Sequence, residues 1–223
     1  MPTTTLSELV EELLAGTRPL PIIPAGVPVL RRPALPYEGQ LTAEQLDRLL
    51  GAMRETMHSA PGVGLAAPQI GVPLRLAVIE DPAEVAAEVR EARGRVPLPY
   101  RVLVNPSYEP VGEDRAAFFE GCLSVPGWQA VVSRPQRIRL RGQDETGRDI
   151  DEEFTGWPAR IVQHETDHLD GVLYLDLAET RSLSSAQAVT DYWSQPTPAA
   201  AARSLGFPVR GTGSATGTGT GAP

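Results

Sequence analysis

Residues 164–168 read His-Glu-Thr-Asp-His and contain two of the three histidines in the chain. Residues four apart lie on one face of a helix, about one turn from each other, so His164 and His168 could bind a single metal ion. Glu165 lies at the rim of that face, close enough to reach a metal-bound water. The same pattern also arises by chance on solvated helices. Here the surrounding residues predict a helix, and we interpret the pattern as a metal site.

A metal held by two imidazoles needs a third protein ligand. One class of metalloproteases places it three residues after a glycine; Gly171 occupies the glycine position, but Tyr174 stands where the histidine should be. Asp176 and Glu179 are carboxylate candidates in a segment that resembles a strand leaving the helix. Cys122 is a better candidate, because a thiolate is a strong ligand for divalent iron or zinc. A lone cysteine is more often a buried structural residue, so residue types alone leave the third ligand open.

Three segments, taken together and in order, resemble the motifs of the peptide deformylases. They are residues 62–69 (GVGLAAPQ), 120–124 (EGCLS) and 163–168 (QHETDH). Each motif alone has false positives, whereas all three in this order and separation are specific. The resemblance extends over roughly residues 20–180. It implies a metal-dependent hydrolase that removes the N-terminal formyl group from N-formylmethionyl nascent polypeptides and releases formate.

The resemblance also implies roles for individual residues. Three metal ligands are implied, with water as the fourth: Cys122, His164 and His168. Glu165 is implied as the general base that afterwards passes a proton to the departing amine. The side-chain amide of Gln69 and the backbone N–H of Leu123 are implied donors to the negative charge that develops on the formyl oxygen. The expected metal is Fe2+, one per chain, with Zn2+, Ni2+ or Co2+ as possible substitutes.

A further set is implied to contact the substrate: Val63, Gly64, Gly121, Trp157, Arg160 and Ile161. Within it, Gly64 is implied to pair with the substrate backbone as an added strand, although a glycine turn after a helix is the simpler interpretation. Trp157 and Ile161 could equally be ordinary core residues. Behind the cysteine loop, the resemblance implies an ion pair between Glu120 and Arg134, with Asp167 helping to orient a ligand histidine.

The elements that must position these residues can be predicted from local patterns. Thr42 and Gln45 form a capping box before a helix that should stop near Pro61. Strand-like runs follow at 74–79, 102–105, 116–119, 129–133 and 138–141, and a turn at 144–147 leads to another at 150–154. A helix should open at 156–158 and end near Gly171. We predict an α+β fold with antiparallel β-sheets packed around a central metal-binding helix that carries the HExxH pattern.

The chain of 223 residues divides into four predicted regions. They are an N-terminal helical extension at 1–17, a catalytic domain at 18–180, a C-terminal helix at 181–194 and a Pro/Gly/Thr-rich disordered tail at 195–223. The charged segment 82–99 is expected to be a solvated insertion between two strands, and we infer no function for it.

Composition restricts the partners that the chain could bind. Net charge is −8 and no Lys/Arg cluster is present, which argues against direct nucleic-acid binding. No apolar run approaches the ~20 residues of a membrane span, and the N-terminus lacks the basic region of a secretory signal. A single cysteine suits a reducing, cytoplasmic location. The expected partners are N-formylmethionyl peptides and nascent chains at the ribosome, although the C-terminal helix lacks a basic face for docking there.

Two other functions remain as alternatives. The first is an HExxH metallopeptidase, which the missing third histidine and the presence of Gln69 argue against. The second is a non-catalytic peptide-binding relative, which would normally have lost Glu165, Gln69 or a ligand. Assays with a formylated peptide and with an internally cleavable peptide would distinguish these functions.

Overall fold

The computed structural model describes residues 5–209, which form two antiparallel sheets and the helices around them. The larger sheet has five strands in the order β1 (Gly64–Ala66), β2 (Leu76–Asp81), β3 (Leu98–Pro110), β6 (Arg137–Gln143) and β7 (Asp149–Thr155). The smaller sheet has three, in the order β4 (Arg115–Cys122), β5 (Val125–Pro135) and β8 (Ser184–Ser185). The predicted α+β class with antiparallel sheets is confirmed.

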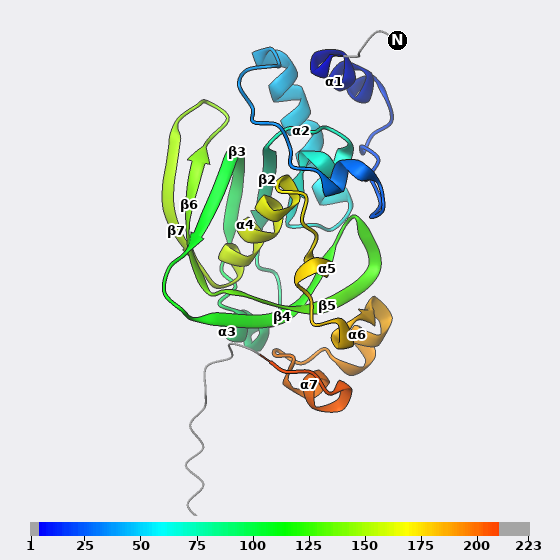
Figure 1. Ribbon diagram of the computed structural model, residues 1–223, viewed down its shortest axis with the longest axis vertical. Helices are drawn as coiled ribbons and strands as arrows, with labels where there is room; N and C mark the ends of the chain where they lie inside the picture. The colour runs from blue at the N-terminus through cyan, green and yellow to red at the C-terminus, as the bar shows by residue number, and fades with distance from the viewer. Residues whose placement is uncertain (1–4, 210–223) are drawn as a thin grey trace, which may run out of the picture.

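Seven α-helices surround or separate the sheets in the described part of the chain. They are α1 (Leu6–Ala15), α2 (Ala43–Ser59), α3 (Ala87–Arg93), α4 (Gly156–Leu169), α5 (Tyr174–Leu177), α6 (Ala186–Tyr192) and α7 (Ala199–Leu205). Short 3-10 turns occur at η1 (Pro28–Arg31), η2 (Ala67–Ile70) and η3 (Thr180–Ser182). Figure 1 shows α4 in the middle of the molecule, between the larger sheet and strands β4 and β5. None of the helices in the described residues is long and apolar enough to cross a membrane.

Strand β2 shows how one sheet supports both α2 and α4. Leu76 and Val78 join a core with helices α1 and α2, whereas Ala77 and Ile79 join a core with α4. Successive side chains of a strand point to opposite faces, so a continuous apolar run is what a strand covered on both sides requires. On α4, Ile161 and Val162 pack against this second face. Burying each large aliphatic side chain contributes about 1.5–3 kcal/mol, which fixes α4 on the sheet.

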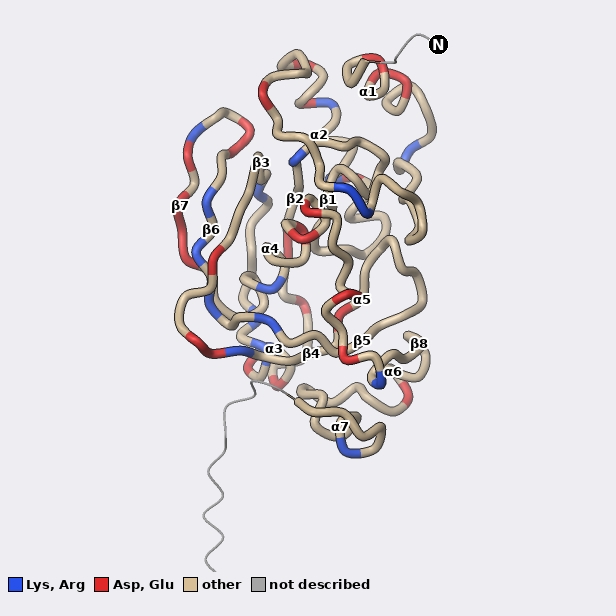
Figure 2. The backbone as a smooth tube through the Cα atoms, in the orientation of Figure 1, with Lys and Arg blue, Asp and Glu red and all other residues tan. Residues whose placement is uncertain are grey.

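The hairpin of β6 and β7 has the solvated face that its alternating residues predict. Ile138 and Leu140 are buried, whereas Arg139 reaches outward to Asp151 on β7 at 2.5 Å. Figure 2 shows the basic positions of β6 beside the acidic positions of β7. The turn is held by Asp144, whose carboxylate accepts hydrogen bonds from the backbone N–H groups of Thr146 and Arg148.

Several elements differ from the predictions. Strands β3 and β5 are longer than expected, and β1 and β8 were not predicted, because strands of three and two residues are too short to show a period. The strand expected to leave the metal-binding helix at Asp176 and Glu179 is wrong: Asp176 accepts a hydrogen bond from the N–H of Leu173 and stabilises the short helix α5.

The C-terminal region has a shorter helix than predicted and a second helix that was not predicted. The helix expected at 181–194 begins only at Ala186, where Ser185 caps it. Residues 199–205, placed by composition in the disordered tail, form α7 because four consecutive alanines favour a helix and its Ala201 packs with Phe207 against β4. The remainder of that tail, from 210 onward, lies outside the described residues. The segment 82–99 is mostly exposed but is not a plain solvated loop, since it contains α3 and the partly buried Arg93.

Candidate active site

Three side chains converge where the two sheets meet at α4. The ligand atoms of Cys122, His164 and His168 all lie within 4.8 Å of one another. The thiol sulfur is 3.2 Å from Nε2 of His168, and the two imidazole rings are 5.0 Å apart between centroids. One thiolate and two imidazoles at this separation fit the three-ligand set of a tetrahedral divalent metal site.

Each ligand is placed by a different local feature. The two histidines lie one turn apart on α4, whose Gly156 start and apolar face set its position on the sheet. Cys122 ends β4 at the tight connection to β5, and the N–H of Ser124 donates to its sulfur at 3.4 Å. The sequence spacing therefore determines the histidine pair, whereas the approach of the cysteine depends on the tertiary fold.

The protonation of the two rings differs. Burial opposes a proton on both, but Cys122 and Glu120, which accept hydrogen bonds from the ring, raise the pKa of His164 well above its usual value. Burial and the neighbouring His164 hold the pKa of His168 well below its usual value. A neutral imidazole is the form that can bind a metal. Nδ1 of His168 is buried without a hydrogen-bond partner among the residues that the structure describes.

Glu120 holds His164 from behind. Its carboxylate lies 3.1 Å from Nδ1 of His164, which directs Nε2 toward the ligand cluster. Arg134 binds both oxygens of Glu120, at 2.7 and 3.0 Å, and the guanidinium of Arg160 also contacts the carboxylate. Burial favours a neutral Glu120, yet Arg134 and Arg160 hold its pKa well below the usual value. The expected Glu120–Arg134 pair is present and is fully buried.

Asp167 does not contact a candidate ligand histidine directly, although such a contact had been expected. Its carboxylate accepts hydrogen bonds from Arg134 at 2.6 Å and from the hydroxyl of Tyr108 at 2.9 Å. Among the described residues it forms no hydrogen bond with His164 or His168, so its connection to His164 runs through Arg134 and Glu120. The resulting chain of buried contacts runs from Tyr108 to the metal ligand.

Glu165 points into the site from α4 and is 4% exposed. Burial raises its pKa to about 7, which is near the value that suits proton transfer at neutral pH. Its carboxylate fits against Gly64 of β1: a Cβ at Gly64 would lie 2.3 Å from Oε1 of Glu165. The glycine is therefore needed for close contact with the proposed base, and not only for a turn.

Gln69 is held with its amide group toward the cysteine. The N–H of Ala66 donates to its Oε1 at 2.8 Å, so Nε2 faces the site and lies 3.6 Å from the sulfur of Cys122. The same nitrogen donates to Oγ of Ser124 at 3.3 Å. A side-chain amide fixed by a backbone contact is suited to donate to a developing negative charge.

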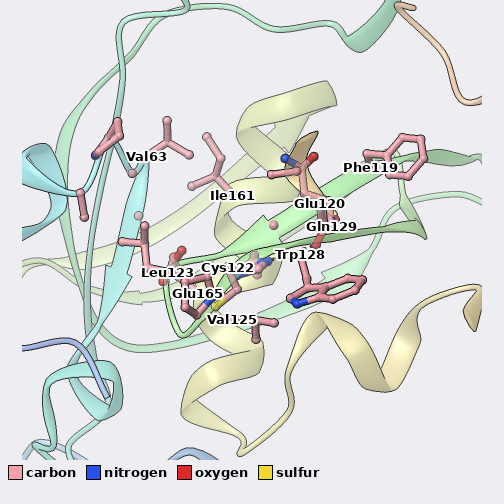
Figure 3. Close-up of a pocket in the computed structure, with 18 of the residues that line it drawn as sticks. Val63, Phe119, Glu120, Cys122, Leu123, Val125, Trp128, Gln129, Ile161 and Glu165 are labelled. Carbon is pink, nitrogen blue, oxygen red and sulfur yellow. Dashed lines mark hydrogen bonds and ion pairs between the residues drawn. The ribbon is translucent and has the colours of Figure 1, made fainter. Parts of the chain in front are cut away.

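A cavity of about 710 Å³ opens in front of these groups. Figure 3 shows its lining, with Cys122, Leu123 and Glu165 close together and Val63 and Ile161 on the same cavity. Every side chain expected to contact a substrate lines it: Val63, Gly64, Gly121, Trp157, Arg160 and Ile161. The guanidinium of Arg160, however, is turned away toward Glu120 and the carbonyls of Val132 and Ala116.

The competing third ligands are engaged elsewhere. Asp176 pairs with Arg31 and caps α5, while Glu179 lies beyond that helix. Tyr174, at the position where a protease would carry its third histidine, stacks on His164 at 6.2 Å between centroids and donates its hydroxyl to the carbonyl of Trp128. Tyrosine here packs against the ring of a candidate ligand.

Sequence reasoning did not identify several residues around the site. Ser124, Tyr108 and Tyr174 support the ligands and Gln69, and Arg93 lines the cavity from α3. Ser124 ends the 120–124 motif and the others have no local pattern, but none of these contacts could be predicted, because each joins segments far apart in the chain.

Comparisons with known proteins agree on one family. The model of the polypeptide deformylase family matches residues 19–183. A protein named peptide deformylase 3, from Streptomyces avermitilis, is 71% identical over 202 residues, which is 91% of this chain and 90% of that protein. Peptide deformylase 1 of Streptomyces coelicolor is 68% identical over 206 residues, covering 92% of this chain and 94% of the other.

Solved structures give the same result. A peptide deformylase from Synechococcus elongatus in complex with actinonin has a TM-score of 0.64 at 33% identity and covers 88% of this chain and 95% of its own. A Met-Ala-Ser-bound class I type b peptide deformylase from Acinetobacter baumannii has a TM-score of 0.64 at 32% identity and covers 71% of this chain and 97% of its own.

Proposed function

This chain belongs to the polypeptide deformylase family, and we propose that Cys122, His164 and His168 bind the divalent metal with which it removes N-terminal formyl groups from nascent polypeptides. The observation that carries this assignment is the cluster of three ligand atoms within 4.8 Å, at the same cavity as Glu165 and Gln69. When bound, the cation would supply a nucleophile from water at neutral pH and polarise the formyl carbonyl.

Glu165 carries the proton in this proposal. It accepts a proton as water adds to the formyl carbon, then donates it to the amine nitrogen as the C–N bond breaks and formate leaves. Its burial and its raised pKa support both steps, because a group that titrates near neutrality can accept and return a proton. Gly64 and the packing of α4 keep its carboxylate in place.

Gln69 and Leu123 stabilise the charge on the formyl oxygen. The fixed amide of Gln69 supports the first assignment, and the position of Leu123 beside Cys122 at the cavity supports the second. A donor of this type contributes about 3 kcal/mol to lowering the barrier.

The peptide binds beside β1 as an added strand. Among the described strands β1 is the outer strand of its sheet and pairs with β2 alone, which leaves its other edge toward the cavity at Gly64. The first side chain of the substrate enters between Val63 and Ile161, with Trp157 further along α4. That a related deformylase binds Met-Ala-Ser supports a short peptide as the ligand.

We propose Fe2+ as the native metal, one per chain, with Zn2+, Ni2+ or Co2+ able to replace it. If iron is native, activity falls in air and in peroxide, because ferrous iron and the Cys122 thiolate both oxidise. A zinc-loaded chain that is stable in air and has the same turnover as the iron-loaded chain would contradict iron as the native metal. Nascent chains at the ribosome are the proposed partners in a cytoplasmic location, and ribosome pelleting of the tagged chain tests the association.

Anaerobic purification, elemental analysis and assays on two peptides test the function as a whole. We expect about one metal per chain, formate release from formyl-Met-Ala-Ser, and no cleavage of an unformylated, internally scissile peptide. Internal cleavage would instead indicate a metallopeptidase, and a metal-loaded chain inert to both peptides would indicate a binding protein. Cys122→Ser should lower the metal content, whereas unchanged content would exclude this cysteine as a ligand.

A further inference from the structure

The segment 82–99 is fixed onto the start of α4. The backbone N–H of Trp157 donates to the carbonyl of Gly94 at 3.3 Å, and a Cβ at Gly156 would lie only 2.5 Å from that oxygen. The fully buried carboxylate of Asp81 binds Arg95 with two hydrogen bonds of 2.8 and 2.9 Å. Because the cap residue of α4 makes no side-chain hydrogen bond, this segment supplies a partner for the first helical turn.

This docking places Arg93, the last residue of α3, in the cavity wall. Its guanidinium lies 5.0 Å from the ring centroid of Trp157 and 5.6 Å from that of Phe118. It lines the same cavity as Cys122 and Glu165. These cation–π contacts hold the guanidinium of Arg93 against the two rings at the cavity wall.

Arg93 differs from the other arginines beside it because it has no acceptor. Arg95 is bound to Asp81, and Arg160 is bound to Glu120. Within residues 5–209 the Arg93 side chain makes no hydrogen bond and no ion pair, and its buried Nε has no partner. A charged guanidinium without an acceptor gains considerably when an acceptor reaches it.

The substrate side chain has the length to supply that acceptor. His164, Ile161 and Trp157 follow one face of α4, and the seven residues between the first and last span about 10 Å at about 1.5 Å each. An extended methionine measures roughly 8 Å from the formyl carbon to its terminal methyl, at ordinary bond lengths. A side chain that starts at the metal ligands therefore ends near Trp157 and Arg93.

We propose that Arg93 closes the far end of the side-chain pocket and that its guanidinium donates a hydrogen bond to a sulfur or sulfoxide acceptor on the first residue of the substrate. The acceptor is the thioether sulfur of methionine, a weak one, or the oxygen of methionine sulfoxide, a strong one. Arg93 is thus a specificity-determining residue supplied by a segment outside the three motifs. The inference rests on the proposed function.

Three formyl peptides that differ only in the first residue test it: formyl-Met-Ala-Ser, formyl-norleucine-Ala-Ser and formyl-methionine sulfoxide-Ala-Ser. Norleucine has the shape of methionine and no acceptor, so it serves as the reference substrate. Arg93→Met removes the donor and keeps an apolar stem over Trp157. Arg90→Met, on an exposed residue of the same helix, is the matched control.

We expect Arg93→Met to lower the sulfoxide-to-norleucine ratio of kcat/KM by about tenfold or more, and the methionine-to-norleucine ratio by a few-fold. Ratios to the norleucine peptide cancel any loss that is common to all three peptides, and Arg90→Met should change neither ratio. Arg93→Lys keeps a cation over the ring with different donor geometry and should give an intermediate sulfoxide ratio, which also tests the inference if the methionine variant folds poorly.

Unchanged ratios in an active Arg93→Met would overturn the inference, and so would equal losses on all three peptides, because a purely structural role does not discriminate between side chains. Failure of the proposed function itself would be seen separately, as a metal-loaded wild-type chain that releases formate from none of the three.

Discussion

Gly64→Ala tests whether Glu165 must be in its observed position. The added Cβ would lie 2.3 Å from Oε1, 2.5 Å from Cδ and 2.6 Å from Cγ of Glu165, whereas ordinary contacts begin at 3.4 Å. The side chain must therefore move by about 1 Å, since its Cγ as well as its carboxylate is too close. Gly64 does not have a positive φ, so alanine is compatible with the backbone.

A displacement of about 1 Å in a catalytic group lowers the rate by about 100-fold, equivalent to about 2.7 kcal/mol in the barrier. We expect that loss in kcat/KM for formyl-Met-Ala-Ser, with metal content by elemental analysis unchanged because no ligand is touched. Gly51→Ala is the control: its Cβ meets nothing within 4 Å on the exposed side of α2, so activity should be kept and stability raised by up to about 1 kcal/mol.

Retention of kcat/KM within about threefold in a fully metal-loaded Gly64→Ala would refute the argument. It would mean either that Glu165 is active without occupying its observed position beside Gly64, or that Glu165 is not the base. Loss of metal in this variant would also contradict the reasoning, because it would place the effect at the ligands.

Three further perturbations have expected outcomes. Glu165→Gln should keep the metal while formate release falls at least 100-fold; substantial residual turnover would remove Glu165 as the base. Arg134→Met leaves two buried carboxylates, Glu120 and Asp167, without their shared cation. It should lower the free energy of unfolding, measured in urea, by about 3–5 kcal/mol, whereas Arg139→Met, at an exposed ion pair, should change it by less than about 1 kcal/mol. Equal effects of the two variants would contradict a stabilising role for the buried network. Removal of the metal by a chelator should abolish turnover and lower the melting temperature. The far-ultraviolet circular dichroism should be preserved, because α4 is packed in the core of the larger sheet. Loss of that signal would show that the fold depends on the metal.

Local patterns predicted the helices and strands that are long enough to show a repeat of apolar residues. Helix α2 starts at the capping box of Thr42 and Gln45, and α4 covers the histidine motif, because both have caps or breakers and an apolar face. The alternation of arginine with apolar residues predicted the solvent-exposed face of β6. These features depend on residues close together in the chain.

The composition of the site could be predicted only in part, for a physical reason. Spacing places His164 and His168 together, but the approach of Cys122 requires β4 to lie across α4, and that is a tertiary contact. Only the resemblance of three motifs pointed to it. Arg93 and Tyr108 had no such motif, and their contacts with Trp157 and Asp167 join distant segments. Composition also misplaced residues 199–205, where an alanine run outweighs the glycine-rich sequence that follows.

X-ray absorption of the zinc-loaded chain tests the central claim, the ligand set, most directly. Cys122, His164 and His168 predict one sulfur at about 2.3 Å and two nitrogens at about 2.0–2.1 Å from the metal. The sulfur shell should disappear in Cys122→Ser while the nitrogen shell persists. A spectrum without sulfur in the wild-type chain, or one unchanged by Cys122→Ser, would contradict the assignment of this site.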